Sequence, residues 1–166
     1  MSEWSWEGND AEWAINIHSI GMVISMLFLV LYVVIIITLS PYAEDNQLLE
    51  LSIVASIMVV TFTSLAVYSY TRIKSIRRAI ANLKKVEIRD GLIILNTING
   101  AYTAKLNEIT ICYKTIIGRG FRPYAYNVFI NYQGITYQIP YLKPEDYGAL
   151  RQALKGHGMD ISECTA

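Results

Sequence analysis

The chain has 166 residues, of which 53% are hydrophobic and 17% are charged. Its 14 basic and 14 acidic side chains cancel in number, but they occupy different parts of the chain. Residues 1–71 contain seven acidic residues and no Lys or Arg, so every basic residue follows Thr71. The composition is more apolar than that of an average soluble domain. Residues 72–166 leave room for one small soluble domain and exclude a larger soluble architecture.

The segment 1–14 combines three tryptophans with four acidic residues. Indole rings favour the headgroup level of a membrane, where carboxylates stay hydrated, so we expect an interfacial segment. An aromatic cage for a ligand is the alternative. No basic region precedes the first apolar stretch, which argues against a cleaved secretory signal.

Two apolar stretches follow, and residues 15–71 are expected to form a transmembrane hairpin with helices at 15–40 and 49–70. Each is long enough to cross a hydrocarbon core, which needs roughly 20 helical residues. The short polar connection forces the second helix to return antiparallel beside the first. His18 is the one side chain in the first stretch that titrates near neutral pH, and the stretch has no Asp, Glu, Lys or Arg. We expect it to be interfacial; a haem or metal ligand is the alternative.

The sequence changes abruptly after Tyr70, because residues 72–85 hold six basic side chains among isoleucines and leucines at helical spacing. We expect a basic juxtamembrane helix that binds the membrane surface. Its basic residues are Arg72, Lys74, Arg77, Arg78, Lys84 and Lys85. Basic residues beside a span mark the cytoplasmic side, so we expect a multi-pass protein of the cell membrane with both termini in the cytoplasm. The alternative is that these charges serve only as an ordinary topology signal.

Residues 86–156 have the period of strands, with turn dipeptides between them. The dipeptides Asp90-Gly91, Asn99-Gly100 and Gln133-Gly134 predict tight hairpin turns. Pro144 followed by two acidic residues predicts a closing helix to about Lys155, and a tail, 157–166, follows it. The strands are expected at residues 86–89, 92–96, 102–106, 108–117, 126–132 and 135–141.

This arrangement resembles prokaryotic membrane proteins with two transmembrane helices followed by a bacterial pleckstrin-homology-like domain. The stretches VEIRDGLIIL, LNEITICYKT and YLKPEDYGALRQAL are similar to the opening hairpin, a following strand and the closing helix of that domain. The resemblance implies an α+β membrane protein: a two-helix transmembrane hairpin, then a small antiparallel β-barrel or sandwich closed by a C-terminal helix. The first hairpin lacks the Lys/Arg cluster with which phosphoinositide-binding relatives hold their headgroup.

The sequence contains none of the common catalytic or nucleotide-binding motifs. No GxSxG, HExxH, Walker A or GxGxxG pattern occurs. Cys112 and Cys164 lie far apart and outside any metal-ligand spacing, so we expect a core residue and a tail thiol. His157 is expected to be exposed to solvent. We therefore expect no enzyme, no cofactor, no metal and no small-molecule substrate.

The loop region 118–126 combines Arg with aromatic residues, the types that dominate binding hot spots. Its expected partner-binding residues are Arg119, Phe121, Arg122, Tyr124 and Tyr126. The alternative is that Phe121 and Tyr126 fold inward as core. Residues 86–166 hold eight basic residues against seven acidic ones, with no basic stripe, which argues against nucleic-acid binding.

These features predict a non-enzymatic, membrane-anchored adaptor that presents its β-domain to proteins or lipids at the cytoplasmic face. The alternative is an accessory or structural subunit of a large membrane complex. The expected partners are membrane lipids and other membrane-protein subunits.

Overall fold

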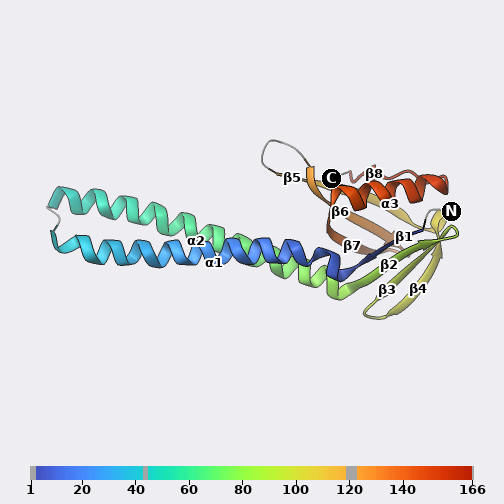
Figure 1. The fold of residues 1–166 in the computed structure, drawn as a ribbon, viewed down its shortest axis with the longest axis horizontal. Helices are drawn as coiled ribbons and strands as arrows, with labels where there is room; N and C mark the ends of the chain where they lie inside the picture. Colours follow the sequence, from blue (N-terminus) through green and yellow to red (C-terminus); the bar gives the residue numbers. More distant parts are fainter. Residues whose placement is uncertain (1–2, 43–44, 119–122, 166) are drawn as a thin grey trace. The chain divides into compact units, whose positions relative to one another are not determined.

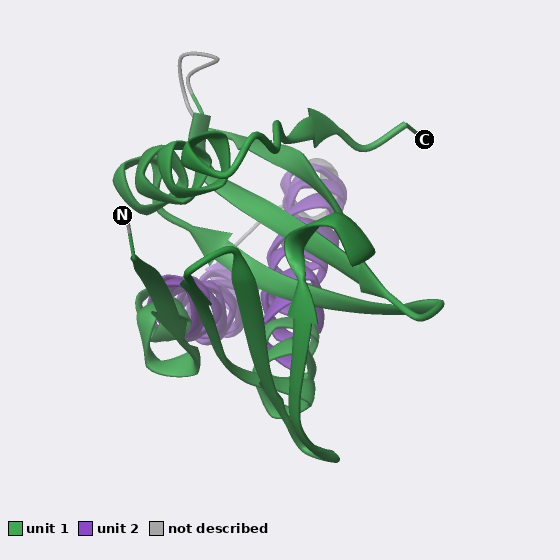
Figure 2. Ribbon diagram, turned by 90° about the vertical axis from the view of Figure 1, so that its right-hand side faces the viewer, with its two compact units in different colours: residues 1–13, 75–166 green, residues 14–74 purple. Residues whose placement is uncertain are grey.

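The computed structural model describes residues 3–42, 45–118 and 123–165. The chain divides into two compact units, coloured separately in Figure 2. The first joins residues 1–13 to residues 75–166, and the second comprises residues 14–74. The first unit is thus built from two distant parts of the sequence, with the second inserted between them.

The second unit is a helical hairpin (Figure 1). It contains most of α1 (Glu12–Leu39), the short η2 (Ser40–Tyr42) and most of α2 (Asp45–Asn82). Phe28 stacks on Phe62 with ring centroids 5.4 Å apart, and His18 meets Tyr68 edge-on at 6.2 Å, so the two helices run antiparallel. This confirms the two expected apolar helices, although α2 is one continuous helix to Asn82.

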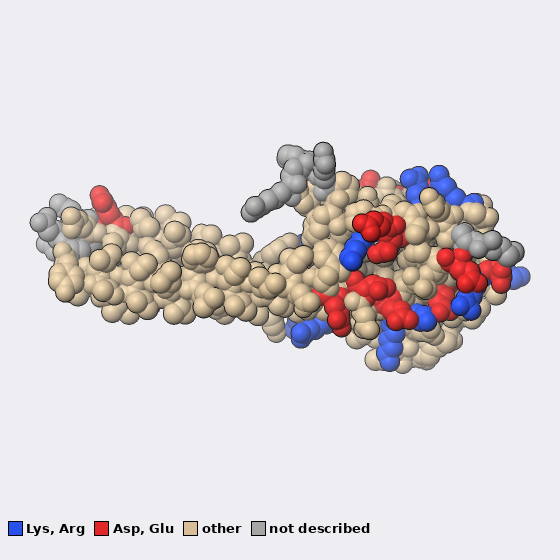
Figure 3. Space-filling view, in the orientation of Figure 1, with Lys and Arg blue, Asp and Glu red and all other residues tan. Residues whose placement is uncertain are grey.

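The stretches Gly8–Tyr42 and Leu49–Asn82 are each long and apolar enough to cross a membrane. Only 6% of the most apolar part of each is buried, so they differ from core helices of soluble proteins. The face drawn in Figure 3 shows almost no acidic or basic atoms along the hairpin. Hydroxyl groups within the helices donate to carbonyls one turn earlier, as from Ser25 to Gly21 and from Thr61 to Ile57, which leaves these groups satisfied in apolar surroundings.

The first unit contains two four-stranded sheets and a helix (Figures 1 and 2). One sheet has the order β1-β2-β3-β4 and the other has the order β7-β6-β5-β8. The elements are β1 (Trp4–Glu7), η1 (Gly8–Ala11), β2 (Leu83–Arg89), β3 (Leu92–Thr97), β4 (Gly100–Lys105), η3 (Leu106–Glu108), β5 (Thr110–Ile117), β6 (Pro123–Tyr132), β7 (Ile135–Leu142), α3 (Pro144–Gly156) and β8 (Ser162–Glu163). The expected strands and closing helix are therefore present, with ends shifted by a few residues.

Of the two expected forms, an antiparallel barrel or a sandwich, the closed barrel is wrong. Among the described residues, no ladder joins one sheet to the other, because η3 separates β4 from β5 and the chain reverses there without pairing. The second sheet is also mixed, since β8 pairs parallel to β5. The fold class is α+β: two long apolar helices and two sheets with a helix.

Two of the three hairpin turns lie at the dipeptides that predicted them. Asp90 and Gly91 have φ of 49° and 76°, and Gln133 and Gly134 have φ of 51° and 78°. Two successive positive φ values are the geometry of a type I′ turn, which matches the twist of the flanking strands. The turn predicted at Asn99-Gly100 lies one residue earlier, at Ile98 and Asn99, because Gly100, with φ of 127°, is the first residue of β4 and pairs with Thr97.

The N-terminal segment is a strand of the β-domain, which corrects the expectation of an interfacial segment. Trp4 and Trp6 are only 8% and 2% exposed, and they pair with Ile88 and Val86 of β2. The indoles point into the core because they occupy alternate positions of a strand, and alternate side chains share one face. Gly8 lets the chain after β1 lie close to Ile80 of α2, since a Cβ at Gly8 would lie 2.6 Å from a methyl carbon of Ile80.

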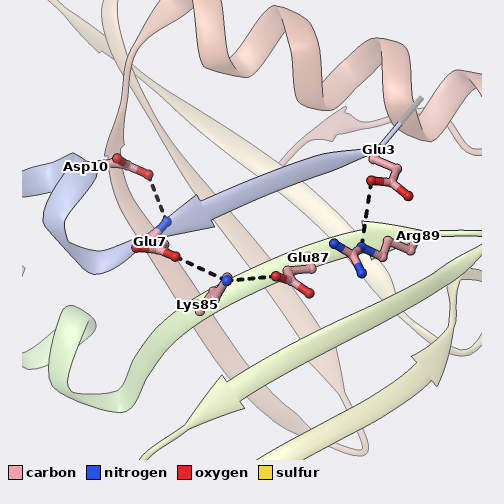
Figure 4. A network of polar contacts seen from close by, with 6 residues as sticks. All are labelled: Glu3, Glu7, Asp10, Lys85, Glu87 and Arg89. Atoms are coloured by element: carbon pink, nitrogen blue, oxygen red, sulfur yellow. Dashed lines mark hydrogen bonds and ion pairs between the residues drawn. The ribbon is translucent and has the colours of Figure 1, made fainter.

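Ion pairs on the outer side of β1 hold its register on β2 (Figure 4). Lys85 Nζ lies 3.2 Å from Glu7 Oε1 and 2.8 Å from Glu87 Oε1. At the other end, Arg89 Nε lies 3.8 Å from Glu3 Oε2. The pairing raises the pKa of Lys85 and lowers that of Glu87, chiefly through the hydrogen bond between the two side chains. Because the pairs are solvent-exposed, they select the register more than they stabilise the fold.

The core of the first unit lies between the sheets and α3. Its fully buried aliphatic side chains come from α2, both sheets and α3. They include Ile76, Leu83, Val86, Ile88, Ile93, Leu95, Val128, Ile130, Ile139, Leu142, Leu150 and Leu154. Burial of apolar surface on this scale is the main stabilising contribution to the unit.

We predict that Trp6→Ala destabilises the β-domain by about 3–5 kcal/mol, the usual cost of truncating a buried aromatic residue. Ser5→Ala on the exposed face of the same strand should leave stability within about 0.5 kcal/mol. Thermal unfolding in detergent, followed by near-ultraviolet circular dichroism, measures both. Equal midpoints for Trp6→Ala and the unchanged protein would show that β1 is dispensable.

Candidate functional site

The six basic residues expected at the membrane surface belong to two different elements. Arg72, Lys74, Arg77 and Arg78 are exposed along the last turns of α2, while Ile73 and Ile76 between them are buried. Lys84 and Lys85 lie in β2, where Lys85 makes the ion pairs with Glu7 and Glu87. The helical basic surface therefore consists of the four residues 72, 74, 77 and 78.

The side chain of Arg72 has a further contact within the hairpin. Its guanidinium carbon lies 5.0 Å from the centroid of the Tyr68 ring, one turn earlier on α2. A cation over an aromatic face is held there by the ring quadrupole. The contact orients the first of the four helical charges.

Tyr126, expected to contact a partner, is half-buried and packs against other aromatic rings of the β-domain. Its ring stacks on Tyr147 of α3 with centroids 4.0 Å apart, and Tyr113 of β5 lies 5.2 Å from Tyr147 and 5.8 Å from Tyr126. This tyrosine stack joins β5, β6 and α3. These ring contacts cover part of the Tyr126 side chain, and its role in binding a partner stays a prediction.

Tyr124 belongs to a different cluster, which we call the Trp13 cluster: Trp13, Tyr124 and Tyr141. Both tyrosine rings meet Trp13 edge-on at 6.2 Å. The register shift between Ile116 and Ile117 makes Tyr124 the extra residue of a bulge on β6, and bulges redirect side chains. Tyr124 stays 37% exposed. Of the five expected partner-binding residues, it is the one the structure describes at the surface.

Two unusual features accompany this cluster. Tyr141 has φ of 52°, a conformation that bulky residues rarely adopt. The backbone N–H of Tyr141 donates a hydrogen bond to Asn127 Oδ1 at 3.0 Å. Trp13 Nε1 is buried with no hydrogen-bond partner among the described residues. Strained backbone and unsatisfied buried donors concentrate at functional sites. The Trp13 cluster is therefore the best-supported candidate for an interaction surface on the N-terminal side of α1.

Arg119, Phe121 and Arg122, the other three expected partner-binding residues, lie outside the described residues. The structure describes the two sides of that loop. Before it, Gly118 is in close contact with Tyr124, because a Cβ at Gly118 would lie 3.2 Å from the tyrosine ring.

Cys112 and Cys164 form a disulfide, so the expectation of a core residue and a free tail thiol is wrong. The tail returns to the sheet as β8, where Ser162 and Glu163 pair with Cys112 and Tyr113. The sequence spacing hides this pairing because the cysteines are 52 positions apart. Closing a loop of that length stabilises a fold by about 4 kcal/mol on the chain-entropy account.

Neither metal chemistry nor a known relative marks the site. Within residues 3–42, 45–118 and 123–165 there is no group of three or more His, Cys, Asp and Glu side chains that could hold a metal ion. No family model, curated protein or solved structure matches the chain. The features that bear on function are the Trp13 cluster, the basic surface, the tail and the hairpin.

The tyrosine stack predicts an alkaline limit to stability. Burial, followed by the neighbouring Tyr113, raises the pKa of Tyr147 to about 12. In the unfolded chain this phenol ionises near pH 10. The unfolded state therefore loses a proton first, and stability falls between about pH 10 and pH 12.

We expect Tyr147→Phe to reduce this fall, because phenylalanine keeps the ring stack and removes the titrating group. Urea unfolding at pH 8, 10 and 11 would measure the difference. Tyr132→Phe is the matched control, since Tyr132 lies outside the stack. If the pH dependence of Tyr147→Phe equals that of the unchanged protein, Tyr147 does not limit alkaline stability.

Proposed function

We propose that this protein is a non-enzymatic, membrane-anchored adaptor whose hairpin crosses the cell membrane twice and whose β-domain presents a protein-binding surface at the cytoplasmic face. The pairing of β1 with β2 is the observation that carries the proposal. Residues before the first apolar stretch and residues after the second fold into one domain. Both flanks must therefore lie on the same side of a membrane, which is the topology of a hairpin anchor.

Exposure of the hairpin supports the membrane part of the proposal. Large apolar side chains are exposed along both helices, including Leu27 at 64%, Val30 at 59% and Val60 at 65%. Soluble monomers rarely expose contiguous apolar surface of this extent. A lipid environment covers it at no cost.

Two observations bear on which side the β-domain faces. Basic residues flank only the domain side of the hairpin, which favours the cytoplasm. The disulfide favours an oxidising compartment, since such bonds are rare in most cytosolic proteins. We give the charges more weight because they determine the direction of insertion, whereas disulfides also occur inside some cells as reversible redox links.

A cysteine-labelling experiment tests the orientation. In a Cys112→Ser, Cys164→Ser background, Gln47→Cys should react with a membrane-impermeant maleimide in whole cells. Asn99→Cys, at the exposed turn before β4, should react only after lysis. The reverse pattern would place the β-domain outside the cell, and labelling of both sites in whole cells would contradict a double crossing.

The exposed side of the Trp13 cluster is the surface we assign to the protein partner. Tyr124→Ala should lower recovery of cross-linked partners roughly tenfold, the loss typical of a hot-spot residue, and shift the thermal midpoint by only a few degrees. Tyr132→Ala is the matched control, because it removes a tyrosine from the other end of β6. Unchanged recovery for Tyr124→Ala would exclude this surface.

An apolar groove in the hairpin favours a second candidate function, that of an accessory subunit of a larger membrane complex. The groove has a volume of about 350 Å³ and is lined by Met22, Met26, Leu29, Thr63, Ala66, Val67 and Tyr70. Small and flexible side chains of this kind allow close packing of another helix in lipid. On this alternative the hairpin itself, and not Tyr124, holds the partner.

A further inference from the structure

We infer that the free edge of β5 is a binding site for an extended peptide, and that the protein's own tail occupies the start of this edge while the disulfide between Cys112 and Cys164 holds it there. The redox role of the disulfide rests on the proposed cytoplasmic orientation, whereas the strand-addition site does not.

The tail demonstrates the binding mode. Ser162 and Glu163 pair in parallel with Cys112 and Tyr113, and the backbone N–H of Cys164 donates to the carbonyl oxygen of Tyr113 at 2.9 Å. Addition of an extended segment to a sheet edge is a recurrent mode of peptide recognition, in which main-chain hydrogen bonds provide affinity. The tail therefore indicates that the ligand of this edge is an extended peptide segment.

The tail covers only part of the edge. β5 runs on to Ile117, and in the described part of the chain no strand pairs with this side of β5 beyond Tyr113. Ile117 is 60% exposed, and Lys114 is exposed as well. An open edge of this kind is a template for a further strand. Because Lys114 is its one charged side chain, the site favours β-branched peptides that are neutral or acidic.

The disulfide is what keeps so short a strand in place. Ser162 and Glu163 are both exposed, so they bury little surface against β5. The residue before this strand, Ile161, is buried at 5% exposure and anchors the tail. The residue after it, Cys164, anchors the tail through its disulfide to Cys112. Without that bond, the segment after Ile161 is held by a two-residue ladder, which is marginal in water.

Release of the tail is a balanced thiol–disulfide exchange. A dithiol reductant attacks one sulfur of the Cys112–Cys164 bond, and its second thiol resolves the mixed disulfide. Each cysteine gains one electron and one proton, and the reductant leaves as its own disulfide. The edge from Cys112 to Ile117 then becomes available to a peptide in trans, because the tail no longer competes at a high effective concentration.

The test uses the full-length protein in detergent and a fluorescent peptide, DISETVTV, which copies the tail up to Glu163 and continues it with β-branched residues. Fluorescence anisotropy measures binding to the oxidised protein, to the protein reduced with dithiothreitol, and to Cys164→Ser. We expect binding to the reduced protein and to Cys164→Ser, and at least about tenfold weaker binding to the oxidised protein, whose tethered tail competes.

The matched control is the same peptide with a methyl group on the backbone nitrogen that follows its glutamate. This removes the donor equivalent to Cys164 N–H and should weaken binding about tenfold, the effect expected for one backbone hydrogen bond. Equal binding of both peptides, equal binding to the oxidised and reduced protein, or no binding to any form would overturn the inference.

Hydrogen exchange provides a readout that needs no peptide. Reduction should speed exchange at the amide of Cys164 at least about tenfold, because the disulfide then no longer restrains the tail beside β5, and should leave Val128 in the centre of β6 unchanged. A tail that stays protected after reduction would contradict release. These measurements use purified protein, so they can fail or succeed independently of the orientation tested in cells.

Discussion

The pairing of β1 with β2 is the constraint on which the rest of the molecule depends. It joins the residues just before the apolar hairpin to the residues just after it, through Trp6 opposite Val86 and Trp4 opposite Ile88. Two buried indoles supply the apolar contacts, and the ion pairs of Lys85 and Arg89 select the register. The hairpin is therefore an insertion into a folded domain and not an appendage at one end of it.

Local signals in the sequence predicted the parts of the fold that depend on neighbouring residues. The Asp90-Gly91 and Gln133-Gly134 dipeptides specify turns by their own backbone preferences, and the apolar stretches specify helices by length. The strand β1 was missed because the alternation in WSWE is too short to identify alone, and the residues that pair with it lie 78 to 84 positions later. The disulfide was missed for the same reason, since only the pairing of β8 brings the cysteines together.

Composition predicted which residue types occur at the candidate site but not which side chains contact one another. Aromatic residues near the Gly-rich loop were expected to act together, but Tyr124 and Tyr126 lie in different clusters. Regular alternation would place both side chains on one face, and the bulge at Tyr124 breaks that alternation. A bulge depends on the register of β5 against β6, which no window of sequence around residue 124 contains. Likewise, Lys84 and Lys85 do not belong to the basic helix, because α2 ends at Asn82 and β2 begins at Leu83.

The separation of β1 from β2 along the chain also fixes an order of events during synthesis. β1 leaves the ribosome before both long helices, and its partner strand β2 is made only after they are complete. Until then Trp4 and Trp6 have no core to enter, and a chaperone or the membrane surface must cover them. Closure of the β-domain therefore reports that the hairpin has been fully made. A chain truncated or mis-inserted within the hairpin would keep two exposed tryptophans near its N-terminus, a signal that quality-control proteases can recognise.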